Sequence, residues 1–245
     1  MKVVAMIPAR YEASRFPGKL LKDLAGQSVI MRTYEQTLNT QLFDAVYVVT
    51  DSDIIAHEVL THNGKVIRNK REHQTGSDRI AEAAHGINAD LIINVQGDEP
   101  FVNKVILQQI IEEFKNDTTQ AIDVVSLVFS IDNIEDINNP NNVKVVLDQN
   151  NNALYFSRAP IPYPRENTTA QYYQHIGIYG FRKEALERFS QLPMEMLEQT
   201  EKLENLRFLS YGMTVRMLKT KHKSIGIDTP EDLEKARKLI QNTNL

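Results

Sequence analysis

Short apolar runs alternate with amphipathic helical patterns through the first half of this chain, and this alternation constrains the fold more than any other feature. The apolar runs predict strands at 3–9, 45–50, 65–68, 91–96 and 124–131, and the helical patterns lie near 29–40, 53–62, 77–86 and 104–115. Buried strands without polar alternation, joined by helices, are typical of a parallel sheet. The sequence therefore predicts an α/β fold, a mostly parallel sheet with helices on both faces.

The second half of the chain is less regular. A hairpin is expected from 143–147 and 153–157, because Asn-rich turn segments flank both runs. Residues 159–164, APIPYP, predict an extended loop, since proline fits neither a helix interior nor a central strand. The remaining expected elements are a strand at 172–181, helices at 183–191 and 197–211, a strand at 214–218, and a last helix with Thr229 as N-cap and Pro230 at its first position.

Composition excludes several classes of protein. The 245 residues include no cysteine, which excludes disulfides, thiolate catalysis and Cys-based zinc sites and fits a reducing cytoplasm. No run approaches the roughly 18 apolar residues of a membrane span, and the first residues enter a strand directly, without a signal-peptide pattern. The net charge of −4 disfavours a nucleic-acid binder, and local positive charge must attract any polyanionic ligand.

Such local charge follows the first expected strand. Residues 7–19 read IPARYEASRFPGK and place Arg10, Arg15 and Lys19 around a Pro17-Gly18 turn signal. Loops at the carboxyl ends of strands are where open α/β sheets bind ligands. The segment therefore indicates a site for a polyanion such as a nucleoside triphosphate, and the alternative is a surface loop with solvated arginines.

One acidic segment suggests a metal site. The run NVQGDEP at 94–100 ends a strand and presents Asp98 and Glu99, and carboxylates are hard ligands that suit Mg²⁺. A turn with solvated acids is the alternative. Asp228 stands alone before the last helix, in the run GIDTP at 226–230, and is otherwise an ordinary residue preceding an N-cap.

Two other strand-to-helix loops have a structural and a functional interpretation. The run QTGSDR at 74–79 opens a helix whose free backbone N–H groups suit an anion or a base edge, although a simple cap by Thr75 or Ser77 also explains it. Asp51 ends the second strand, and capping of the next helix by Ser52 or Asp53 is the better explanation there.

Taken together, these runs resemble a known family. Residues 7–19 look like the N-terminal signature of the sugar-activating nucleotidyltransferases. With the runs QGDEP at 96–100, YFSR at 155–158, HIGIY at 175–179, ENLR at 204–207 and DTPED at 228–232, the chain resembles the 3-deoxy-manno-octulosonate (Kdo) cytidylyltransferase family, the CMP-Kdo synthetases, from Ile7 to about Leu239. Asn205 stands where that family often has Gln, and Leu20 where it often has Pro.

The resemblance implies roles for individual residues. The nucleotide would be bound by Pro8, Ala9, Arg10, Arg15, Lys19, Gln74, Gly76, Ser77 and Arg79. The acid sugar would be bound by Gln96, Arg158, His175, Tyr179, Glu204 and Asn205. Mg²⁺ would be bound by Asp98 and Asp228, and Arg10, Lys19, Asp98 and Asp228 would be the catalytic residues.

The resemblance also implies an overall organisation and activity. It implies one nucleotidyltransferase domain over 1–245, in which residues 132–215 or so form a smaller α/β lobe for sugar binding and dimerisation. The expected enzyme is a cytoplasmic homodimer that makes CMP-Kdo and pyrophosphate from CTP and Kdo, with Mg²⁺, for lipopolysaccharide biosynthesis. It would bind neither nucleic acid nor membranes.

Alternative functions belong to two classes. Another acid sugar, such as 8-amino-Kdo or sialic acid, or another nucleotide such as UTP, would keep the reaction type. A dinucleotide-binding oxidoreductase or a non-catalytic nucleotide sensor would belong to a different functional class. The chain lacks both the Gly-x-Gly-x-x-Gly fingerprint after its first strand and a Gly-x₄-Gly-Lys-[Ser/Thr] loop, which disfavours a dehydrogenase and a P-loop enzyme.

Overall fold

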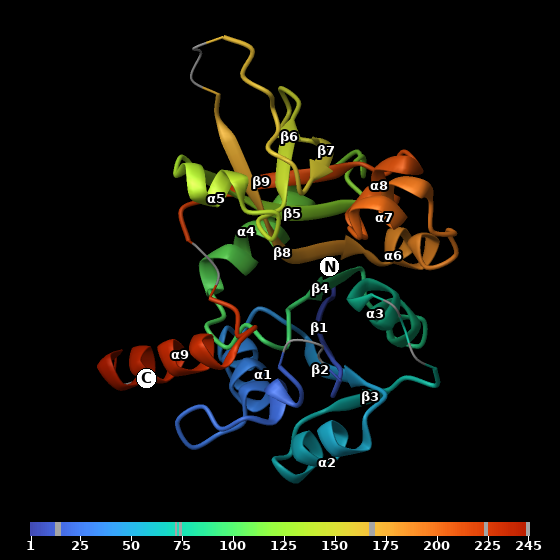
Figure 1. Cartoon of the computed structure of the whole chain (residues 1–245). Coiled ribbons are helices and arrows are strands. Elements are labelled where there is room, and N and C mark those ends of the chain that lie inside the picture. Colours follow the sequence, from blue (N-terminus) through green and yellow to red (C-terminus); the bar gives the residue numbers. More distant parts are fainter. Residues whose placement is uncertain (13–15, 72, 74, 167–169, 223–224, 244–245) are drawn as a thin grey trace. The chain divides into compact units, whose positions relative to one another are not determined.

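The computed structural model describes residues 1–12, 16–71, 73, 75–166, 170–222 and 225–243. The chain divides into two compact units (Figure 1). The first comprises residues 1–107 and 224–245, and the second comprises residues 108–223. The lobe predicted over 132–215 lies within the second unit. None of the helices in the described part of the chain is long and apolar enough to cross a membrane.

The first unit contains a parallel sheet. Its strands lie in the order β3-β2-β1-β4, and every neighbouring pair is parallel. The strands are β1 (Val3–Ala9), β2 (Ala45–Thr50), β3 (Val66–Arg68) and β4 (Leu91–Asn94). The other elements of this unit are η1 (Lys19–Leu21), α1 (Val29–Asn39), α2 (Asp53–Thr61), α3 (Gly76–Ala84) and α9 (Pro230–Thr243), and α4 (Lys104–Asn116) crosses the division between the units.

Burial explains the arrangement of this sheet. Every residue of β4 is buried, as is nearly all of β1. Strands that are apolar on both faces need cover on both faces. Figure 1 shows α1 and α3 on opposite sides of β1 and β2. The predicted parallel sheet with helices on both faces is therefore confirmed.

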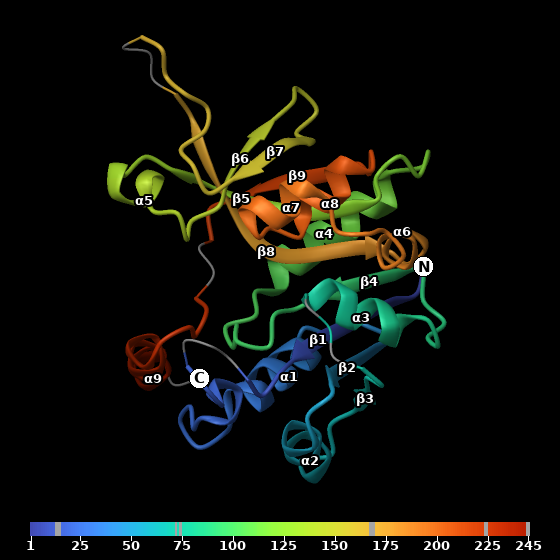
Figure 2. The same cartoon turned by 45° about the vertical axis from the view of Figure 1, so that its right-hand side comes forward.

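The second unit is built around β5 (Val124–Ile131). This strand pairs antiparallel with β8 (Tyr172–Arg182) and parallel with β9 (Val215–Thr220). The predicted hairpin is confirmed as β6 (Lys144–Leu147) and β7 (Ala153–Ser157). Figure 2 shows α6 (Lys183–Phe189), α7 (Met196–Glu201) and α8 (Asn205–Ser210) grouped beside β8, and α5 (Ile134–Asn138) is a short helix that the sequence did not predict.

The single helix predicted at 197–211 is wrong, because the structure has two helices there. The chain leaves α7 at Lys202, which adopts a left-handed conformation with φ 54°, and resumes a helix as α8. No glycine or proline marks this break. Its cause is tertiary: the break lets Arg207 of α8 fold back onto Glu198 of α7.

Glu198 and Arg207 form a buried, two-pronged ion pair. The Nε and Nη2 atoms of Arg207 donate to the Glu198 carboxylate at 2.6 Å each. The side chains are only 3% and 5% exposed, respectively. The guanidinium also stacks over the Phe189 ring at 4.3 Å. Since a buried charge is costly without its partner, this pair holds α7 and α8 together.

We expect Glu198→Gln to lower the free energy of unfolding by about 3–5 kcal/mol, because it leaves the buried Arg207 charge uncompensated. The control is Asp53→Asn, which removes the exposed partner of Arg68 and should cost under about 1 kcal/mol. Urea denaturation measures both. Equal effects of the two substitutions would contradict the assignment of α7–α8 stability to this pair.

Candidate functional site

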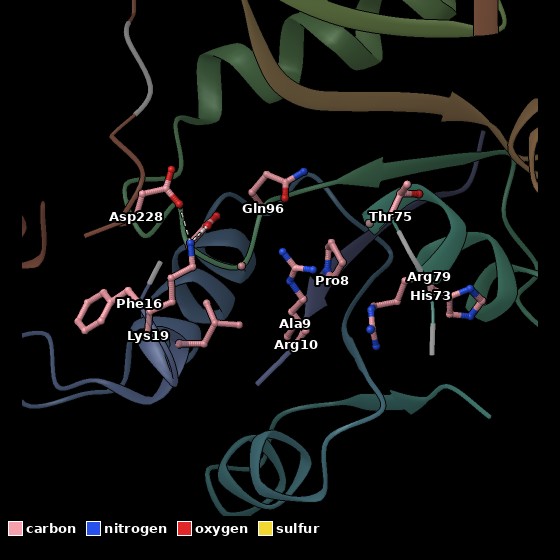
Figure 3. Close-up of a pocket in the computed structure, with 14 residues that line it drawn as sticks. Pro8, Ala9, Arg10, Phe16, Lys19, His73, Thr75, Arg79, Gln96 and Asp228 are labelled. Carbon is pink, nitrogen blue, oxygen red and sulfur yellow. Dashed lines mark hydrogen bonds and ion pairs between the residues drawn. The ribbon is translucent and has the colours of Figure 1, made fainter. Parts of the chain in front are cut away.

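A polar pocket lies at the carboxyl ends of β1 and β4. Figure 3 shows the residues that line it, and its volume is about 250 Å³. Because these strands are parallel neighbours, the loops that follow them meet at one edge of the sheet. The pocket is lined by Pro8, Ala9, Arg10, Phe16, Lys19, Leu20, His73, Thr75, Gly76, Arg79, Gln96, Gly97, Asp98 and Asp228.

Lys19 reaches this pocket from a tight turn after β1. Gly18 has φ 66°, a left-handed conformation that glycine adopts without strain. Its amide donates to the Tyr11 carbonyl at 3.2 Å, which closes the loop, and the 3₁₀ helix η1 begins at the next residue. The predicted Pro-Gly turn thus places the Lys19 side chain at the sheet edge.

Asp98 and Asp228 are brought together by main-chain contacts. The Ile227 amide donates to the Asp98 carbonyl at 2.9 Å, so the segment before α9 lies against the loop after β4. On the other side, the Thr33 hydroxyl of α1 donates to the Gly97 carbonyl at 3.0 Å. These contacts fix both acidic residues beside Lys19.

The Lys19 ammonium lies between the two carboxylates (Figure 3). Its Nζ atom donates to Oδ2 of Asp98 at 2.5 Å and to Oδ1 of Asp228 at 2.9 Å. Burial by itself lowers the pKa of Lys19, but attraction and hydrogen bonds from Asp98 and Asp228 outweigh it and raise that pKa above its ordinary value. Lys19 is therefore a permanent cation in the pocket, and the predicted convergence of the two distant carboxylates is found.

The start of α3 forms another wall of the pocket. Thr75 is the N-cap and accepts from the Asp78 amide at 3.1 Å, which confirms one of the two predicted caps. Gly76 lines the pocket, whereas Ser77 is fully buried and does not line it. Arg15 and Gln74, which the sequence assigned to the nucleotide, lie outside the described residues.

Arg79 also lines the pocket, and its guanidinium is held by Asp51. The two side chains pair through Nη1–Oδ1 at 2.9 Å and Nη2–Oδ2 at 3.0 Å. Burial raises the pKa of Asp51, but the hydrogen bonds and charge of Arg79 outweigh this and leave it below its ordinary value. Capping of α2 falls to Ser52, as expected, and Asp51 instead fixes the direction of Arg79.

Sequence reasoning missed several residues of the pocket. Phe16 and Leu20 flank the predicted cations and contribute apolar surface. His73 also lines the pocket, and its ring is hydrogen-bonded to Glu82 of α3. Only their positions in the sequence could have indicated Phe16 and His73, because each is next to a residue assigned to the nucleotide, Arg15 or Gln74.

The predicted sugar-binding residues fall in both units. Gln96 lines the pocket of the first unit, and the others lie in the second unit. There, the His175 and Tyr179 rings on β8 are in contact, with centroids 5.3 Å apart. Burial and the neighbouring Glu204 raise the pKa of Tyr179 well above its ordinary value, so its hydroxyl stays protonated.

Arg158 and Asn205 differ in the hydrogen bonds that their side chains make. The Arg158 guanidinium donates from Nε to the Glu201 carbonyl at 2.7 Å and from Nη1 to the Pro140 carbonyl at 3.0 Å. Its observed contacts thus hold backbone segments together. Asn205 is 2% exposed, and its Oδ1 has no hydrogen-bond partner among the described residues. An orphaned buried acceptor indicates a site for a ligand donor.

The pocket fits a divalent cation only in part by itself. No group of three or more His, Cys, Asp or Glu side chains suitable for a metal occurs in the described chain. Two carboxylates do converge, and they already hold the positive Lys19 ammonium between them. Mg²⁺ is commonly bound by one or two carboxylates together with substrate phosphates, so this donor set is compatible with it.

Residues 4–221 match the cytidylyltransferase family. The chain is 55% identical to a 3-deoxy-manno-octulosonate cytidylyltransferase of Flavobacterium johnsoniae, covering 99% of this chain and 100% of the relative. It is 40% identical to the protein of that name from Escherichia coli, covering 98% and 96%. Similarity therefore extends over the whole described fold.

Solved structures give the same result. CMP:2-keto-3-deoxy-manno-octonic acid synthetase complexed with CTP superimposes with a TM-score of 0.92 at 39% identity, covering 99% of both chains. HddC from Yersinia pseudotuberculosis, complexed with GMP-PN, has a TM-score of 0.69 at 18% identity, covering 98% of this chain and all of that one. The second likeness concerns the fold alone.

Gly97 provides a test of the pocket's packing. A Cβ atom at this position would lie 2.9 Å from the Pro8 carbonyl oxygen. We expect Gly97→Ala to lower the free energy of unfolding by about 1–3 kcal/mol, because the backbone must shift. Gly86→Ala is the control, since no atom lies within 4 Å of its added Cβ. If thermal denaturation shows equal stability for both variants, the close approach of the loop after β4 to β1 is not needed.

Proposed function

Because the chain belongs to the cytidylyltransferase family and, within it, to the 3-deoxy-manno-octulosonate cytidylyltransferases, we propose that it transfers CMP from CTP to Kdo. The anomeric hydroxyl oxygen of Kdo forms a bond to the α-phosphorus, and the bond to the β-phosphate oxygen breaks. The products are CMP-Kdo, for lipopolysaccharide biosynthesis, and pyrophosphate.

One observation carries this proposal: the contact of Lys19 with both Asp98 and Asp228 in a pocket that Arg10 and Gln96 also line. Phosphoryl transfer asks a protein mainly for in-line positioning and for neutralisation of charge. Arg10 and Lys19 hold the triphosphate, and Lys19 offsets the charge that develops on the departing pyrophosphate. Pro8, Ala9 and Gly76 bring backbone close to the nucleotide.

Asp98 and Asp228 would hold Mg²⁺ together with oxygens of the triphosphate. When bound, the ion would polarise the α-phosphate and increase the acidity of the attacking hydroxyl. The residues of the chain supply the rest: Lys19 balances the two carboxylates, and Asp51 keeps Arg79 directed along the pocket wall.

Recognition of the acid sugar is assigned to side chains of the second unit. His175, Tyr179 and Glu204 are grouped there, and the unpartnered oxygen of Asn205 suits a hydroxyl donor. Arg158 is assigned to the carboxylate of the sugar, for which its remaining guanidinium protons are available alongside the bonds to backbone carbonyls.

A homodimer in the cytoplasm completes the proposal. The predicted loop after β7 is largely exposed, and its Tyr163 side chain is 84% accessible. Single exposed aromatic residues are common on protein surfaces, so the dimer is proposed from the resemblance to the family. A cytoplasmic location is proposed because it fits the use of CTP.

The direct test is product analysis after incubation with CTP, Mg²⁺ and Kdo. We expect CMP-Kdo and pyrophosphate in equal amounts, and no product when EDTA removes the metal. A panel containing UTP, sialic acid and 8-amino-Kdo distinguishes the related activities. Binding of CTP without any sugar nucleotide would instead identify a sensor and overturn the proposal.

Lys19→Met should lower kcat by about 10²–10³-fold, because one electrostatic contact to the developing charge is lost. The control is Lys2→Met, which removes an exposed lysine directly before β1. Pyrophosphate release measures both. If Lys19→Met released pyrophosphate at the wild-type rate, the role given to Lys19 would be wrong.

A further inference from the structure

The pairing of β5 with β8 is interrupted opposite Ser126. Val125 pairs with Gly180 and Leu127 pairs with Ile176, so the single residue Ser126 faces the three residues 177–179 of β8. A bulge of this kind removes carbonyl groups from the ladder and redirects nearby side chains. It brings the His175 and Tyr179 rings into contact although they lie four positions apart on one strand.

The Ser126 hydroxyl satisfies the groups that this bulge exposes. It is fully buried, and its Oγ atom lies 2.8 Å from the Ile178 carbonyl oxygen and 3.1 Å from that of Ile176. It also lies 3.0 Å from Nε2 of His175. A hydroxyl has one proton, and carbonyl oxygens only accept. That proton therefore goes to a carbonyl, and the Ser126 oxygen is left to accept from His175.

This arrangement determines the state of His175. If Nε2 had no proton, three acceptors would surround a single hydroxyl proton, so Nε2 carries the hydrogen. Burial lowers the pKa of His175 to about 4, so the ring is neutral near pH 7. Its Nδ1 atom is then a bare acceptor, and it makes no hydrogen bond within the described chain. The Phe156 ring packs edge-on against the imidazole, with centroids 5.2 Å apart, and fixes its plane.

We propose that Ser126 is a positioning residue that holds His175 in the Nε2–H form, so that Nδ1 accepts a hydrogen bond from a hydroxyl group of the sugar. This inference rests on the proposed function for the identity of the ligand. The nearby Glu204 carboxylate is a second acceptor in this group. The site therefore selects a polyol that offers hydroxyl hydrogens, and it disfavours an analogue with an ether at the same carbon.

The protonation state is tested first, on the ligand-free wild-type protein. Long-range ¹H–¹⁵N NMR of ¹⁵N-histidine-labelled protein distinguishes the two neutral ring forms, and His175→Gln assigns its signals among the six histidines. We expect His175 to be neutral at pH 7, with the proton on Nε2. An Nδ1–H form or an imidazolium would overturn the proposal without any substitution at Ser126.

The second test separates positioning from folding. In Ser126→Ala, Nε2 loses its acceptor, so we expect a mixture of ring forms and a KM for Kdo raised roughly tenfold, the loss of about one hydrogen bond. The KM for CTP should stay within about twofold, which also reports an intact fold. Ser126→Thr keeps the hydroxyl and should restore both readouts, and Ser130→Ala, at an exposed position of β5, should change neither.

The outcomes distinguish this inference from the proposed function. If His175 has the expected form but no CMP-Kdo is made, the proposed function fails and the role of Ser126 in setting the ring form remains. If CMP-Kdo is made and Ser126→Ala changes neither the ring form nor the KM for Kdo, the inference fails alone. A Ser126→Ala protein that does not fold leaves the wild-type NMR result to decide.

Discussion

The contact of one ammonium with two carboxylates is the interaction on which the pocket depends. Lys19, Asp98 and Asp228 come from η1, from the loop after β4 and from the segment before α9, which are far apart in the sequence. Two carboxylates this close repel each other unless a cation lies between them. Lys19 supplies that charge, while the Ile227–Asp98 main-chain bond supplies the proximity.

The regular elements could be predicted because their signals are local. The strand at 45–50 follows from an apolar run, and the N-caps Ser52 and Thr75 follow from residue type and position. The break between α7 and α8 could not be predicted in this way. It accompanies a buried pair between Arg207 and Glu198, and no glycine or proline within the segment marks it.

In the candidate site, too, some residues have a local sequence signal and others depend on tertiary contacts. Residue type and position beside a strand end were enough to predict Lys19 and Asp98, and resemblance added Asp228. Neither source predicted that Asp51 binds Arg79, since a carboxylate after a strand is more often explained by capping. Ser126 could not be predicted either, because it lies within the apolar run VVSLVF and no sequence motif marks it. The role proposed for it depends on the bulge in β8.

The charges of the pocket divide into an acidic cluster and the basic side chains around it. One ammonium and two carboxylates leave this cluster with a net negative charge, in a chain whose overall charge is −4. Arg10 and Arg79 also line the pocket, so its lining carries three basic and two acidic side chains and does not repel a triphosphate by net charge. In the proposed reaction, a divalent cation carried by the triphosphate would give the Asp98 and Asp228 carboxylates a second positive charge to face. The two acidic residues would then contact the triphosphate through the cation, while Arg10 and Lys19 contact its oxygens directly.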